Sequence, residues 1–293
     1  MANLREIKRR IGAVKNTKKI TSAMKMVAGA KLRKATDAAT AARPYKNALA
    51  KVLNTVADTV GDESGQELLT AHDKIEKVLI IVFGTDRGLC GSFNTGLFRE
   101  TSKWAEEQEK NGRTVEIWAI GKKAAPYFKS RGSNVTWSKM NIKNDEYMDS
   151  VREIGERLQS TFVSGEVQEV FLGFNTFKNV LLQPTTFTKL LPMTVETSEV
   201  QAVGQELTMI DYKYEPDAET ILDTLVPLYM QTIIHQSFLE TEAGEHASRM
   251  TSMDNATRNA SDIIENLTLL YNRARQAAIT TELIEIVAGA EAL

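Results

Sequence analysis

Apolar residues recur with a helical period at the start of the chain. The stripe continues at intervals of mostly three or four residues through Leu4, Ile7, Ile11, Val14, Ile20, Met24 and Val27. Such spacing is typical of one face of a long amphipathic helix. The only strong helix breakers before about residue 60 are Gly12, Gly29 and Pro44, so we predict a helical segment over residues 1–60.

The period changes in the middle of the chain. Short apolar runs rich in β-branched residues lie at 77–83, 114–120 and 167–174, and helical stretches separate them. This alternation predicts βαβ units with a mainly parallel sheet. Residues 179–195 alternate around Pro184, which is typical of edge strands. We therefore predict a Rossmann-like α/β domain over residues 75–210.

A second long helix is predicted over residues 217–293, because no proline occurs from Leu228 to the end. One stripe there keeps a four-three spacing through Ala256, Ala260, Ile263, Leu267, Leu270, Ala274, Ala277, Thr281, Ile284 and Ala288. Sustained heptad spacing is the signal of a coiled coil. The two end segments are natural partners, so the fold class is α/β, with a long antiparallel coiled coil of the N- and C-terminal helices beside the central domain.

The distribution of charge along the chain points to a binding partner. The chain of 293 residues has a net charge of only −2, yet Glu6 is the one acid in residues 1–34. The basic residues of that segment are Arg5, Lys8, Arg9, Arg10, Lys15, Lys18, Lys19, Lys25, Lys31, Arg33 and Lys34. So many like charges on one helix repel one another and predict an acidic partner.

Three kinds of partner are open for the basic helix: nucleic acid, an anionic membrane surface, or an acidic protein surface. Residues 1–44 contain no aromatic side chain for stacking on bases or for anchoring in a membrane interface. An acidic protein fits best. The alternative is a basic coiled-coil adaptor that binds nucleic acid, with an affinity that falls steeply as salt rises.

The sequence has few residues in patterns typical of catalysis or of phosphate or metal binding. The glycine-rich stretch at 84–91 matches no phosphate-binding pattern, and we interpret its Asp86 and Arg87 as turn residues. The single cysteine, Cys90, excludes an internal disulfide, and three scattered histidines do not make a metal site. We expect no catalytic residues, metal or cofactor. An enzyme that binds a nucleotide on its α/β domain stays open as a further alternative, and it predicts stoichiometric nucleotide binding by the isolated chain.

Targeting signals are also missing from the sequence. No run of 18 apolar residues occurs, and the basic N-terminus has neither a secretory apolar core nor the composition of an import presequence. We therefore expect a protein that works in the compartment where it is made, with a bacterial origin favoured.

Three motifs together carry a family resemblance. They are Leu4-Arg-Glu-Ile-Lys-Arg-Arg-Ile11 with the following helix to Ala28, Thr85-Asp-Arg-Gly-Leu-Cys-Gly91, and a C-terminal I-T-x-E-x-x-E-I-x-x-G-A pattern over residues 279–290. The chain resembles the gamma subunit of F-type ATP synthases from end to end. Dithiol switching, known in photosynthetic members with two nearby cysteines, is not available here, because Cys90 is the only cysteine.

The resemblance implies a rotary mechanism. In that family the two terminal helices turn inside a ring of three alpha and three beta subunits, and the α/β domain sits with the epsilon subunit on the membrane-embedded c ring. Proton or sodium flow turns this stalk, which drives ATP synthesis at beta-subunit sites and regulates ATPase activity. The implied protein is non-catalytic and does not bind nucleic acid. It is peripheral to the cytoplasmic face of a bacterial inner membrane through its complex.

Candidate site residues follow from the same resemblance. The basic neck that meets the beta subunits comprises Arg9, Arg10, Lys18, Lys19, Met24 and Lys25. The group that contacts a beta-subunit loop and supports coupling comprises Arg249, Arg275, Gln276, Thr280 and Glu282. The foot that rests on the c ring comprises Tyr212 and Glu215.

Overall fold

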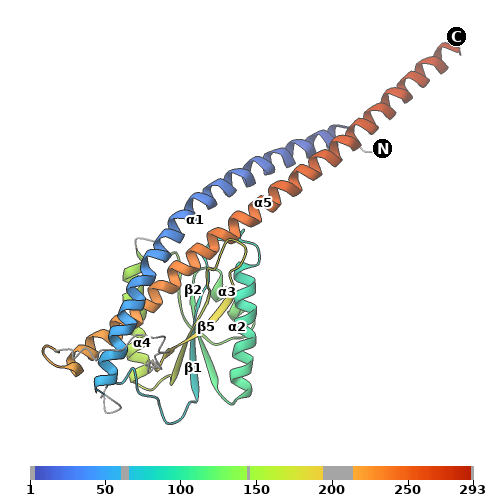
Figure 1. The fold of residues 1–293 in the computed structure, drawn as a ribbon. Coiled ribbons are helices and arrows are strands. Elements are labelled where there is room, and N and C mark those ends of the chain that lie inside the picture. Colours follow the sequence, from blue (N-terminus) through green and yellow to red (C-terminus); the bar gives the residue numbers. More distant parts are fainter. Residues whose placement is uncertain (1–3, 61–65, 144–145, 194–213, 292–293) are drawn as a thin grey trace, which may run out of the picture. The chain divides into compact units, whose positions relative to one another are not determined.

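The computed structural model describes residues 4–60, 66–143, 146–193 and 214–291 (Figure 1). Contacts divide the chain into a terminal unit, made of Met1–Ala30 and Arg249–Leu293, and a central unit, Lys31–Ser248. Two long helices, α1 (Leu4–Val60) and α5 (Ala218–Glu291), contribute to both units. With 74 residues, α5 is about 110 Å long at the usual rise of 1.5 Å per residue.

In the terminal unit, α1 and α5 pack antiparallel. Thr257 Oγ1 donates a hydrogen bond to Thr21 Oγ1 at 2.7 Å, and Lys25 Nζ contacts Asp254 Oδ1 at 2.6 Å. Residue numbers rise in one helix as they fall in the other, which confirms the predicted antiparallel pairing. Ala28 and Ala260 are both buried, so the helices approach closely through small side chains.

The predicted heptad stripe of α5 was wrong in phase at two of its largest residues. Ile263 and Leu270 are each 47% exposed, whereas Met253 and Ala260 are buried. The side that faces α1 keeps Ala260 and Leu267 of the predicted stripe but otherwise runs through Met253, Thr257 and Ile264. Apolar residues occupy more than one side of this helix, so hydrophobicity alone did not identify the side that α1 covers.

The central unit contains a five-stranded sheet in the order β3-β2-β1-β4-β5. Its strands are β1 (Lys77–Phe83), β2 (Thr114–Ile120), β3 (Val135–Lys139), β4 (Glu169–Asn175) and β5 (Thr185–Leu191). The first four are parallel, and β5 is an antiparallel edge strand. An edge strand was predicted within residues 179–195, but β5 begins only after Pro184, which has no backbone N–H to donate to a neighbouring strand. The sequence missed β3, because this five-residue edge strand is only half-buried and has no apolar run.

Helices α2 (Phe93–Lys110), α3 (Ala124–Lys129) and α4 (Tyr147–Val163) cover the sheet together with α5. Alternate residues of β1 enter two separate cores. Leu79, Ile81 and Phe83 pack with side chains of α4 and α5, whereas Ile80 and Val82 pack with those of α2 and α3. Burial of both faces explains why β1 reads as one continuous apolar run.

The exits of β1 and β2 come unusually close. Gly84 N donates to Ile120 O at 2.9 Å, and Gly121 has a φ of +87°. A Cβ placed on Gly121 would lie 2.5 Å from Gly84 O, so only glycine fits this point. The close approach draws the two exit loops together at the carboxyl edge of the sheet.

We predict that Gly121→Ala destabilises the chain far more than Gly112→Ala. Both glycines have positive φ, but a Cβ on Gly112 meets nothing within 4 Å. At Gly112 the strain of alanine in a left-handed backbone lowers the free energy of unfolding by about 1 kcal/mol. At Gly121 the clash with Gly84 adds to this strain and raises the loss to about 3 kcal/mol or more. Urea unfolding of the two variants measures the difference. Equal losses would show that the close approach of the loops does not constrain the fold.

Candidate functional site

The basic neck lies on the α1 part of the terminal unit. Arg9, Arg10, Lys18 and Lys19 are exposed, and Met24 is half-buried. Arg10 pairs with Glu6 at 2.7 Å on its own helix, whereas Lys25 reaches across to Asp254. The structure therefore presents five of the six neck residues as exposed cations, of which Lys25 also holds the two helices in register.

The end of α5 carries the second candidate group. Arg275, Gln276, Thr280 and Glu282 are all exposed, and Thr280 Oγ1 donates to Gln276 O at 2.9 Å. The same end of α5 bears large apolar side chains that are 49–68% exposed: Ile279, Leu283, Ile284, Ile286 and Val287. We call these five residues the terminal apolar patch. So many exposed apolar side chains together mark an interaction surface.

Arg249 differs from the rest of its predicted group. It is 7% exposed, so its guanidinium belongs to the packing of the chain and not to the surface that bears Arg275 and Glu282. Buried arginine is rare unless its charge is partnered. The sequence placed Arg249 on the correct helix but did not reveal its burial.

Only one of the two foot residues can be located, since Tyr212 lies outside the described residues. Glu215 is exposed and lies two residues before Asp217, which caps the start of α5. The Asp217 carboxylate accepts bonds from the Thr220 backbone N–H at 2.8 Å and from the Thr220 hydroxyl at 3.0 Å. These bonds lower the pKa of Asp217 and fix the start of the helix beside Glu215.

The glycine-rich stretch after β1 forms a loop with a bend at Asp86. Asp86 Oδ1 accepts bonds from the backbone N–H groups of Lys122, at 2.7 Å, and Asn141, at 3.0 Å. Asp86 thus ties the loops after β1, β2 and β3 together. Cys90 is buried beside Asn94 Nδ2, at 3.5 Å.

The described part of the chain has neither a metal-binding cluster nor a helix that could cross a membrane. Its side chains include no cluster of three or more histidine, cysteine or acidic groups suited to a metal ion. None of its helices has the length and hydropathy needed to span a membrane.

The fold is similar to that of central-stalk chains in solved ATP synthases. One chain in the cryo-EM structure of the Euglena gracilis mitochondrial ATP synthase (OSCP/F1/c-ring) superposes with a TM-score of 0.67 at 18% identity, covering 99% of this chain and 94% of that one. A chain of the Tetrahymena thermophila mitochondrial central stalk/c-ring structure gives 0.60 at 24% identity, covering 81% and 99%. These likenesses establish a stalk-like fold.

Sequence relatives identify the family. Residues 3–293 match the ATP synthase family profile. The ATP synthase gamma chain of Chlorobium phaeobacteroides is 42% identical over 100% of this chain and 99% of its own length. That of Hyphomonas neptunium is 43% identical over the full length of both. The protein is thus a subunit of an ATP synthase, and it belongs to the gamma-subunit family of the F-type enzymes.

We predict that Lys25→Ala raises the pKa of Asp254. The Lys25 ammonium, and then the Arg258 guanidinium, hold this carboxyl below its ordinary pKa of 3.8. A carboxyl with a lowered folded pKa stabilises the fold above its ordinary pKa, and this contribution disappears as the pH falls through the folded value. A ¹³C NMR titration of the Asp254 carboxyl measures the shift.

Lys15→Ala is the matched control, because it removes an equally basic residue of α1 that is exposed. The Asp254 midpoint should stay in place in this variant. If both variants moved the midpoint equally, the general charge of the helix, and not the 2.6 Å contact with Lys25, would set the Asp254 pKa.

Proposed function

We propose that this chain is the rotating central stalk that couples proton or sodium flow through a c ring to ATP synthesis and hydrolysis at beta-subunit sites. The observation that carries the proposal is the exposed surface of the terminal unit, basic along α1 and apolar at the end of α5, in a chain of the gamma family. A paired helix with such a surface is suited to a surrounding partner.

The neck acts through the sum of its charges. An exposed ion pair contributes only about 0–1 kcal/mol, so a single contact would hardly bias a partner. Arg9, Arg10, Lys18 and Lys19 lie together on one helix and attract acidic segments of the beta subunits jointly. Met24 and Lys25 complete this surface beside the helix seam.

Rotation requires an asymmetric stalk. A ligand shifts a conformational equilibrium only through contacts that differ between the states, and here the stalk takes the place of the ligand. The six neck residues belong to α1 and the terminal apolar patch to α5, so each turn presents a different surface to each beta subunit. The beta subunits then pass in turn through open, loose and tight states.

The end of α5 transmits force to the beta subunits. Arg275, Gln276, Thr280 and Glu282 contact a beta-subunit loop, and the terminal apolar patch next to them is covered by the surrounding subunits. Arg249 supports coupling from within the chain, in agreement with its burial. The stalk has to be stiff. Each unit charge that crosses a membrane potential of 100 mV supplies only about 2.3 kcal/mol, so the energy from several charges must be stored in the stalk before one ATP is made.

The remaining assignments concern assembly. One copy of the chain lies within three alpha and three beta subunits, and the epsilon subunit and the c ring bind its other end, where Tyr212 and Glu215 form the foot. The complex holds the chain at the cytoplasmic face of a bacterial inner membrane. The chain itself is non-catalytic, binds no nucleic acid and regulates ATP hydrolysis by its contacts with the beta subunits.

We predict that mixing the chain with matching alpha and beta subunits yields a complex with one copy per three of each. Multisite ATP hydrolysis should rise strongly, as measured by size-exclusion chromatography and a coupled ATPase assay. Replacing Arg9, Arg10, Lys18 and Lys19 together by alanine should lower the stimulated rate about tenfold, the effect of about 1.4 kcal/mol of lost contact energy.

A second set of four exposed basic residues provides the control: Arg99, Lys103, Lys110 and Lys129, all in the central unit. Their replacement by alanine removes the same charge and should leave stimulation unchanged. The proposal fails if the chain elutes alone, or if both sets lower the rate equally. Nucleic-acid binding would then be the next function to test.

A further inference from the structure

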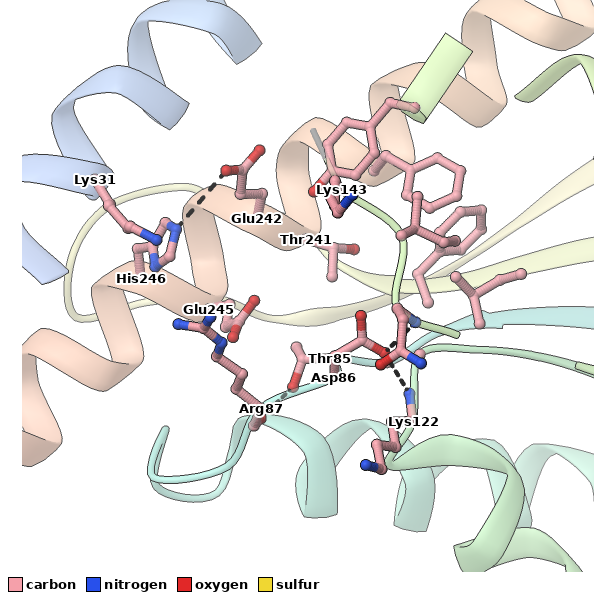
Figure 2. Close-up of a pocket in the computed structure, with 18 of the residues that line it drawn as sticks. Lys31, Thr85, Asp86, Arg87, Lys122, Lys143, Thr241, Glu242, Glu245 and His246 are labelled. Carbon is pink, nitrogen blue, oxygen red and sulfur yellow. Dashed lines mark hydrogen bonds and ion pairs between the residues drawn. The ribbon is translucent and has the colours of Figure 1, made fainter. Parts of the chain in front are cut away.

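A cavity of about 780 Å³ opens in the central unit at the carboxyl edge of the sheet (Figure 2). Its floor includes Gly84, Gly121 and Asn141, which follow β1, β2 and β3. Side chains of α1 and α5 complete the wall. All of its lining residues belong to the central unit, and none is among the predicted stalk contacts.

The position of this cavity has a topological reason. In the sheet, β2 lies next to β1 on one side and β4 lies next to it on the other, so the order in which the chain adds strands reverses at β1. The intervening helices also change face, because α2 packs on one side of the sheet and α4 on the opposite side. In open α/β sheets, small ligands bind outside the carboxyl ends of the strands near such a reversal.

Charge favours an anion in the cavity. The basic lining residues are Lys31, Lys34, Arg87, Lys122 and Lys143, and the acidic ones are Asp86, Glu242 and Glu245. Apart from His246, the lining therefore carries a net charge of +2, and among the described residues only Lys143 of its cations pairs with an acid outside it, Glu146 at 3.2 Å. Figure 2 shows the labelled basic side chains arriving from different sides, with Lys31 on α1 and Arg87 and Lys122 in the loops after the strands.

Two of the three acids of the cavity, Asp86 and Glu242, are held by bonds within the chain. Asp86 accepts the two backbone bonds already described, and Glu242 lies 3.7 Å from His246 Nε2. Glu242 also bonds the Tyr147 hydroxyl, whose pKa is raised by burial and then by Glu242, Glu245 and Asp86. Tyr147 therefore stays neutral, and the two bonded carboxylates are positioned by groups of the protein.

A buried hydroxyl without a partner points to a ligand. Thr241 is 6% exposed and lines the cavity, and its Oγ1 has no hydrogen-bond partner among the described residues. Several other hydroxyls of α5 donate to the carbonyl four residues earlier, as Ser237 does to Ile233 O at 3.0 Å. Since a buried polar group without a bond is costly, Thr241 is suited to meet a ligand atom.

We propose that this cavity binds a small phosphate-bearing anion, with Thr241 Oγ1 donating to it and Lys31, Arg87 and Lys122 balancing its charge. The cavity is larger than inorganic phosphate needs, and Phe83 and Phe238 offer it an apolar wall. A diphosphate, free or as part of a nucleotide, fits these features. This binding is separate from the proposed rotation and does not depend on it.

The test is calorimetric titration of the full-length chain with pyrophosphate, ADP and adenosine. Pyrophosphate and ADP should each bind one to one, and adenosine should not bind. Equal affinity for pyrophosphate and ADP identifies the diphosphate as the ligand, whereas tighter binding of ADP identifies a nucleotide. Thr241→Val and Lys122→Ala should each weaken binding about tenfold, since each removes a hydrogen bond or charge contact to an ionised ligand.

Two control variants separate the site from general charge. Thr241→Ser keeps the hydroxyl and should retain the affinity, and Lys129→Ala removes an exposed lysine outside the cavity and should change nothing. Lys122 is exposed, so its variant is expected to fold even if the variant at buried Thr241 does not. The proposal is overturned if no saturable binding occurs at millimolar ligand, if adenosine binds as tightly as ADP, or if Lys129→Ala weakens binding as much as Lys122→Ala.

Discussion

The close antiparallel packing of α1 and α5 is the constraint on which the terminal unit depends. Helices of 57 and 74 residues have stripes too long for a small domain to cover, so each needs the other. Small residues such as Ala28 and Ala260 let the helices approach, and Lys25–Asp254 and Thr21–Thr257 fix their register. A seam of small side chains buries little apolar area, and it leaves other apolar residues of α5 exposed.

Those exposed residues connect the fold to the function. Ile279 to Val287 would be an aggregation hazard on a protein that worked alone, yet they are an advantage where other subunits enclose the helix. The same reasoning applies to the basic residues of α1, whose mutual repulsion the proposed acidic partner would relieve. In the proposed complex, features that weaken the isolated chain become its contact surfaces.

Much of the fold could be predicted from the sequence because its patterns are strong. Both long helices, strands β1, β2 and β4 and the antiparallel pairing followed from hydrophobic periodicity. Strand β3, the phase of the α5 seam and the burial of Arg249 did not, because each depends on which neighbour covers a residue. The cavity was also missed, since Thr241 and Asp86 are more than 150 residues apart in the sequence and only the fold brings them to one wall.

Observation of single molecules tests the central claim most directly. A cysteine introduced by Lys110→Cys, on the exposed end of α2, can carry a bead, and the native Cys90 is buried and so does not compete for the label. With the alpha and beta subunits fixed to a surface and ATP added, the bead should rotate continuously in one direction, with three pauses in each turn. A labelled chain that stays in place while the complex hydrolyses ATP would show that the chain is not a rotating stalk.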